Sequence, residues 1–128
     1  MLTDVLRFAA PKQPWRMRLS GHSMSPTIRD GDEMLVDPGR RPRLGDVVVF
    51  THDEKLVAHR IIESTQPYIT AGDASRGMRE HVAPEDVIGT VGEVRRAGRV
   101  VQMDSRSIVR AFWLRMRLAI AYHVRVTR

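Results

Sequence analysis

The chain has 128 residues, of which 42% are hydrophobic and 28% are charged, which is the size and composition of one globular domain. It contains no cysteine, and this excludes disulfide bonds, thiolate metal ligands and a cysteine nucleophile. The net charge of +6 is concentrated at one end, because residues 95–128 contain nine arginines and a single acidic residue, Asp104. Seven prolines and nine glycines favour a turn-rich, mainly β domain.

The N-terminal part of the chain is predicted to contain two strands. Residues 1–14 are expected to form an arm, in which residues 2–10 have the pattern of a short helix. Residues 15–19 alternate apolar and basic side chains with a period of two, as a half-buried strand does. A second strand is predicted over residues 33–36. The segment between these strands carries Ser23, which therefore follows a strand end.

A β-hairpin is predicted in the middle of the chain. Residues 47–50 are an uninterrupted apolar run, and residues 56–62 form a second run after a polar turn near Asp53 and Glu54. Two such runs are typical of antiparallel strands joined by a tight turn. Further short strands are predicted over residues 68–70, 87–91 and 99–103, so that residues 15–104 make up one mainly β domain.

The spacing of apolar residues changes after Ser105. Val109, Phe112, Met116 and Ala119 recur at steps of three and four, and Arg106, Arg110 and Arg117 fall on the opposite side of a helix. Residues 105–128 are therefore predicted to form a basic amphipathic helix. Such a helix either packs on its own domain, which is the commoner outcome, or lies in a membrane interface. No uncharged run approaches the about 20 apolar residues that cross a bilayer, so no transmembrane segment is expected in this chain.

Ser23 and His59 are the candidate nucleophile and base. A serine hydroxyl attacks a carbonyl usefully only when a neighbouring base removes its proton. His59 lies within an apolar strand, where alternation places it on the face shared with Val57 and Ile61. Because an unpaired imidazole is costly there, His59 is either a satisfied structural histidine or the base for Ser23.

Several segments, in this order, resemble the signal peptidase I family and its LexA-like relatives. They are Gly21-His22-Ser23-Met24-Ser25-Pro26-Thr27 with Gly31-Asp32, then Gly45-Asp46-Val47-Val48-Val49-Phe50, Leu56-Val57-Ala58-His59-Arg60-Ile61-Ile62, Ala71-Gly72-Asp73-Ala74-Ser75 and Val87-Ile88-Gly89-Thr90-Val91. The resemblance covers about residues 15–94, and several motifs in one order are far more specific than any one of them. It implies a β-ribbon catalytic domain and serine endopeptidase activity.

The resemblance also implies roles for individual residues. Bacterial signal peptidases and LexA-like repressors have a lysine where this chain has His59, whereas the archaeal and endoplasmic-reticulum type has a histidine. His59 is therefore expected to act as general base for Ser23, whose backbone N–H would contribute to the oxyanion hole. Asp73 is expected to orient the imidazole; a structural turn role for Asp73 and a catalytic role for Glu80 are the alternatives. Bacterial and endoplasmic-reticulum members carry a serine where this chain has Gly21, whereas mitochondrial inner-membrane peptidases also have a glycine there.

An extended peptide is the substrate that the resemblance implies, as in the signal or leader peptides of exported proteins. The basic residues 106–124 would then contact a membrane surface peripherally, or the protein would be cytoplasmic. One alternative is a maturation protease dedicated to a single exported peptide. Another is a non-catalytic module that binds lipid or nucleic acid, which the presence of Ser23, His59 and Asp73 does not favour. A self-cleaving repressor is disfavoured because only 22 residues precede Ser23.

No cofactor or metal ion is expected from the sequence. His22, His52 and His81 have a spacing that matches no compact metal-ligand pattern, and no cysteine supplements them.

Overall fold

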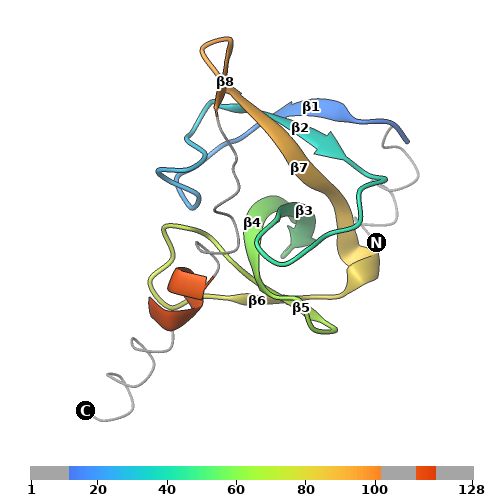
Figure 1. The fold of residues 1–128 in the computed structure, drawn as a ribbon, viewed down its shortest axis with the longest axis vertical. Coiled ribbons are helices and arrows are strands. Elements are labelled where there is room, and N and C mark those ends of the chain that lie inside the picture. The colour runs from blue at the N-terminus through green and yellow to red at the C-terminus, as the bar shows by residue number, and fades with distance from the viewer. Residues whose placement is uncertain (1–11, 102–111, 118–128) are drawn as a thin grey trace.

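The computed structural model describes residues 12–101 and 112–117, and it places eight strands in one antiparallel sheet (Figure 1). The strands are β1 (Trp15–Arg18), β2 (Glu33–Asp37), β3 (Val47–His52), β4 (Lys55–Glu63), β5 (Tyr68–Ala71), β6 (Glu80–Val82), β7 (Val87–Arg96) and β8 (Arg99–Val101). Their order across the sheet is β1-β2-β7-β3-β4-β5-β6, and β8 pairs with β7. The mainly β fold predicted from the sequence is confirmed.

The hairpin formed by β3 and β4 lies at the centre of this order. Val48 pairs with His59, and the register continues without a shift to His52 and Lys55. The turn residues Asp53 and Glu54 both have positive φ, at 50° and 61°, as the tight turn that matches strand twist requires. The predicted hairpin is therefore confirmed, including its polar turn.

Strand β3 is buried on both faces. Val47 and Val49 belong to one apolar cluster, which also contains Met24 and Ile28 from the segment after β1. Val48 and Phe50 belong to a second cluster on the opposite face. This double burial is the physical reason for the uninterrupted apolar run, because a strand with one wet face would alternate.

The two faces of β4 follow the same division. Ala58 belongs to the first cluster and Ile61 to the second. Because successive side chains of a strand point to opposite faces, His59 lies on the side of the second cluster and Arg60 on the side of the first. Two neighbouring polar residues of one strand are thereby directed to different surroundings.

The two ends of the connection between β1 and β2, residues 19–32, are held together by backbone hydrogen bonds. The Leu19 N–H donates to the carbonyl of Asp32 at 2.8 Å, and the Gly31 N–H donates to the carbonyl of Leu19 at 2.8 Å. The buried Asp32 carboxylate accepts two hydrogen bonds from Arg96, from Nε at 3.0 Å and from Nη2 at 2.8 Å. Burial opposes ionisation of Asp32, but the bonds from Arg96 and from the Arg29 N–H lower its pKa overall. Through the Asp32–Arg96 ion pair, the Gly31-Asp32 motif thus links this connection to β7.

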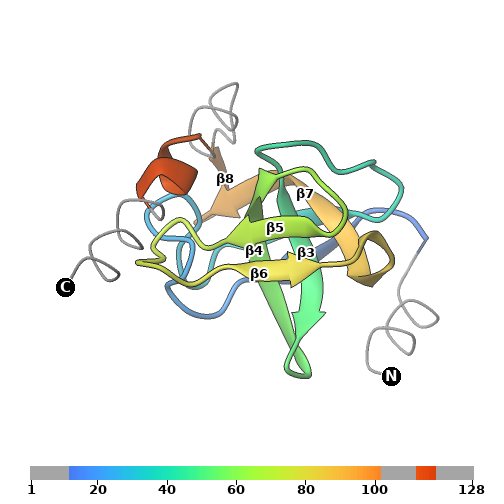
Figure 2. The same cartoon turned by 90° about the horizontal axis from the view of Figure 1, so that it is seen from below.

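The short helix at residues 112–117 lies beside the loop that joins β5 to β6 (Figures 1 and 2). Phe112 and Met116, which belong to the predicted apolar stripe, are both exposed, and Leu114 is the buried residue of the described helix. Leu114 packs with Ile62 and Ala71. Helical periodicity alone did not identify this face, because the choice depends on contacts with a distant strand.

One strand was missed by the sequence analysis, and parts of two predicted helices fall on residues that the structure does not describe. Strand β6 was not predicted, because three residues are too few to show an alternating pattern. The expected helix over residues 2–10, and residues 105–111 and 118–128 of the expected C-terminal helix, lie outside the described residues. Within the described ranges, no helix has the length and apolar character that crossing a bilayer demands.

Candidate active site

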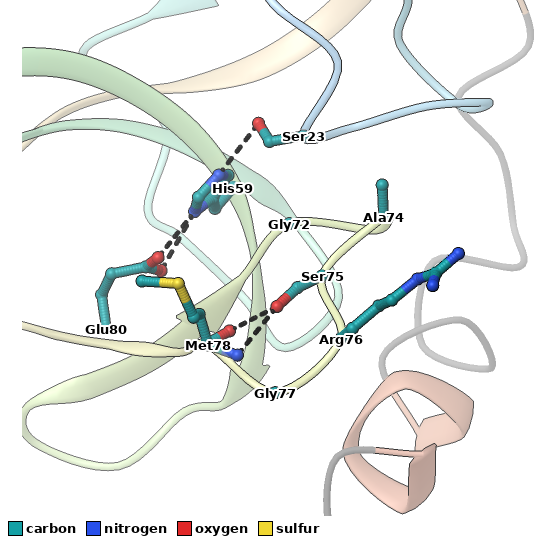
Figure 3. A pocket seen from close by; sticks show the side chains of 9 residues that line it. All are labelled: Ser23, His59, Gly72, Ala74, Ser75, Arg76, Gly77, Met78 and Glu80. Atoms are coloured by element: carbon teal, nitrogen blue, oxygen red, sulfur yellow. Dashed lines mark hydrogen bonds and ion pairs between the residues drawn. The ribbon is translucent and has the colours of Figure 1, made fainter. Parts of the chain in front are cut away.

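Ser23 and His59, which are 36 residues apart in sequence, lie side by side in the structure (Figure 3). The Oγ of Ser23 lies 3.1 Å from Nε2 of His59. Ser23 comes from the connection between β1 and β2, and His59 comes from β4, where the Phe50 ring and the imidazole pack in a T-shaped arrangement at a centroid distance of 6.1 Å. This distance and pairing suit proton transfer from a serine hydroxyl to a histidine.

Glu80 occupies the other side of the imidazole. Both carboxylate oxygens of Glu80 lie 3.0 Å from Nδ1 of His59. Thr70, the partner of Glu80 in the register of β5 and β6, donates its hydroxyl to Oε2 at 2.7 Å. A carboxylate at Nδ1 favours the tautomer that carries its proton there, which leaves the lone pair of Nε2 directed at Ser23.

The ionised form of Glu80 is the stable one in the folded protein. The side chain is 9% exposed, and this burial by itself disfavours the charged form. The hydrogen bond and charge of His59 and the hydroxyl of Thr70 outweigh burial, so the pKa of Glu80 lies below its ordinary value. The site therefore holds a carboxylate that only accepts hydrogen bonds and so supports a proton on Nδ1.

Asp73 does not lie where we expected it. Its carboxylate accepts hydrogen bonds from Nε and Nη2 of Arg60, each at 2.8 Å, and from the Thr27 hydroxyl at 2.7 Å. Arg60 is 1% exposed, so its charge needs a buried partner. The expectation that Asp73 orients the imidazole is thus corrected, because Asp73 pairs with the residue after His59, on the opposite face of β4, and Glu80 contacts the ring.

The backbone of Gly72 passes against both members of the Ser23–His59 pair. A Cβ atom at this position would lie 2.4 Å from the carbonyl oxygen of Ser23 and 3.1 Å from Nε2 of His59. Two residues further on, the Ala74 N–H donates to the same Ser23 carbonyl at 2.9 Å. The glycine of the Ala71–Ser75 motif thus permits the close approach that fixes Ser23 beside His59.

A cavity of about 360 Å³ opens next to the pair (Figure 3). The loop between β5 and β6 forms most of its wall, and that loop is held by Ser75, whose hydroxyl donates to the Met78 carbonyl at 2.7 Å and accepts from the Met78 N–H at 3.1 Å. The lining residues are Ser23, His59, Gly72, Ala74, Ser75, Arg76, Gly77, Met78 and Glu80.

Gly21 has a conformational role. Its φ is +100°, and its N–H donates to Oδ1 of Asp30 at 2.8 Å. A serine would be strained in this backbone conformation, which glycine adopts freely.

Replacing Gly72 with alanine is predicted to destabilise the protein by about 1–3 kcal/mol, because the added methyl group meets backbone atoms that cannot move aside easily. Urea denaturation measures this loss. Gly92→Ala is the matched control, since a Cβ there meets only the Arg40 side chain at 3.7 Å. Equal stabilities of the two variants would contradict the proposed close packing at Gly72.

The lowered pKa of Glu80 predicts a pH-dependent contribution to stability. Above about 4.5, the ordinary value for this carboxyl group, Glu80→Gln is expected to lower the free energy of unfolding by about 1.5–3 kcal/mol, since it weakens a charged hydrogen bond. The difference should shrink as the pH falls through the lowered pKa, where the native carboxylate is protonated. Denaturation of both proteins at a series of pH values from 7 downward tests this, and a difference that does not decrease as the pH falls below about 4.5 contradicts it.

Residues 4–95 match the model of the Peptidase S24-like family, which is more than half of the chain. Comparison with curated proteins finds no match. The matched range contains Ser23, His59 and Glu80, and it spans β1 to β6 and most of β7. This match supports assignment of the chain to the LexA-like superfamily, with a domain of the serine peptidase type. The chain therefore belongs to the Peptidase S24-like family.

Proposed function

We propose that the protein is a serine endopeptidase in which His59 is the general base for Ser23 and Glu80 orients His59. The observation that carries this proposal is the series of hydrogen bonds from Ser23 Oγ through the imidazole to a buried carboxylate, at the wall of a cavity. A purely structural histidine has no need of a serine hydroxyl on one nitrogen and an ionised carboxylate on the other.

In the proposed reaction, Nε2 of His59 takes the Ser23 proton as Oγ bonds to the scissile carbonyl carbon. The backbone N–H of Ser23 is proposed to stabilise the oxyanion that forms. The carbon–nitrogen bond then breaks as the imidazolium returns its proton to the leaving amine. A water molecule, deprotonated by His59, attacks the acyl carbon and releases the acid and Ser23. Glu80 stabilises the imidazolium in both steps without changing its own protonation.

The proposed substrate is an extended peptide with small side chains before the cut, such as the signal or leader peptide of an exported protein. The small residues Ala74 and Gly77 in the cavity wall suit such side chains. Strand β6 ends the sheet order, and its outer edge offers backbone groups with which an extended peptide would pair. A protease that matures one exported peptide is the narrower form of the same proposal.

The assay is cleavage of an internally quenched signal-peptide-like substrate in the presence of lipid. Ser23→Ala and His59→Ala are each expected to abolish cleavage, and Glu80→Gln is expected to lower kcat by about 10²–10⁴ through loss of the correct tautomer. Glu85→Gln, at an exposed position in the turn after β6, is the matched control and is expected to cleave like the unchanged protein. Full activity of Ser23→Ala or His59→Ala would overturn the proposed mechanism.

We also propose that residues 106–124 contact the surface of an anionic membrane. Within this segment, Phe112 and Trp113 are 52% and 65% exposed, in a region rich in arginine. Replacing both aromatic residues with serine is expected to reduce co-sedimentation with phosphatidylglycerol vesicles at least severalfold. Val100→Ser, which changes an exposed apolar residue on β8, is the control. Unchanged sedimentation of the double variant would contradict membrane contact by these side chains.

A further inference from the structure

We propose that the surface next to the catalytic cavity is a cationic subsite that binds a carboxylate of the peptide substrate. This inference rests on the proposed function and adds a specificity to it. The carboxylate comes either from an acidic side chain near the scissile bond or from the C-terminus of a short substrate. Arg76 and Arg117 are the residues that would bind it.

The first observation is the continuity of the surface. A second cavity, of about 470 Å³, is lined by Ser25, Pro26, Asp73, Ala74, Arg76 and Arg117. Ala74 and Arg76 line this cavity and also the one that contains Ser23 and His59. In Figure 3 the Arg76 side chain extends away from His59. A peptide bound across Ser23 that continues past Ala74 therefore enters the second cavity within a few residues.

The second observation is an excess of positive charge. The Asp73 carboxylate in the wall is already neutralised by two hydrogen bonds from the buried Arg60. Neither Arg76 nor Arg117 forms a salt bridge with a carboxylate within residues 12–101 and 112–117. Among the described residues that line the second cavity, Asp73 is the one acid and its charge is balanced by Arg60, so the charges of Arg76 and Arg117 are left in excess. A carboxylate is the peptide group that such a surface attracts.

The third observation concerns the fixed position of Arg117. One of its nitrogens, Nη2, donates to the carbonyls of Asp73 at 2.8 Å and Ser75 at 2.7 Å. A guanidinium has five N–H donors, so the remaining donors serve a ligand while these bonds hold the group in place. Leu114, one turn earlier, anchors the same helix in a buried cluster with Ile62 and Ala71. The cation is thus held in advance, and little side-chain freedom is lost on binding.

The test uses the full chain and pairs of internally quenched peptides built on one cleaved parent sequence. Each pair differs by Glu or Gln at a single position on either side of the cut, and one further pair ends in a free carboxylate or an amide. We expect the unchanged protein to prefer the acidic member at one position, or the free carboxylate, by about tenfold in kcat/KM. Arg76→Ala should reduce this preference at least severalfold, and Arg76→Glu should reverse it.

Arg79→Ala is the matched control, because Arg79 is an exposed arginine of the same loop that lines neither cavity. It should retain the preference in full. Absence of any preference in the unchanged protein, or an equal preference in Arg76→Ala and Arg79→Ala, would overturn the subsite. The pair that responds identifies the source of the carboxylate.

Binding to the full-length Ser23→Ala variant separates this inference from the proposed chemistry. Fluorescence anisotropy of the labelled Glu and Gln peptides should give a Kd about tenfold lower for the acidic peptide, and added salt should reduce the difference. This readout needs no cleavage. A protein that cleaves peptides but shows equal Kd values would overturn the subsite alone, whereas a protein that binds with this preference but never cleaves would overturn the proposed activity alone.

Discussion

The guanidinium of Arg60 is buried in the folded protein, and a buried charge is stable only when a partner neutralises it and its hydrogen bonds are satisfied. Asp73 supplies that partner, while the Gly45 carbonyl accepts from Nη1 at 2.8 Å. Asp73 also accepts from Thr27, in the connection that carries Ser23. One ion pair thereby joins the strand of His59, the segment that carries Ser23 and the loop that lines the cavity. The position of Ser23 against His59 depends on this junction.

The neighbouring residues His59 and Arg60 of β4 lie on opposite faces of the strand and make different contacts. His59 points to Ser23 and Glu80, and Arg60 points to the junction with Asp73. Each of these residues has its own carboxylate partner, Glu80 for His59 and Asp73 for Arg60. Glu80 contacts a ring that changes its charge during the proposed reaction, and Asp73 contacts a guanidinium that takes no part in it. A shift of one residue in the register of β4 would exchange these surroundings and destroy both.

The sequence allowed prediction of the strands whose patterns are long, and of residues carried by specific motifs. The apolar run at residues 47–50 predicted β3, and the resemblance identified Ser23 and His59, which the structure brings together. The resemblance favoured Asp73 over Glu80 as the residue that orients His59, because Asp73 lies within the Ala71–Ser75 motif. Glu80 reaches His59 only through the pairing of β5 with β6, a three-residue strand whose register no local pattern reveals. The burial of Arg60 was likewise hidden, because an arginine in a strand normally indicates a solvent-exposed position.

The most direct test of the arrangement is the tautomer of His59, measured by NMR of the full protein with ¹⁵N-labelled histidine, with the signal assigned through its loss in His59→Ala. A carboxylate at Nδ1 and a serine hydroxyl at Nε2 predict that the neutral ring carries its proton on Nδ1, and that Glu80→Gln removes or weakens this preference. A neutral ring protonated on Nε2, or a spectrum that Glu80→Gln leaves unchanged, would contradict the account in which Glu80 sets His59 to accept the proton of Ser23.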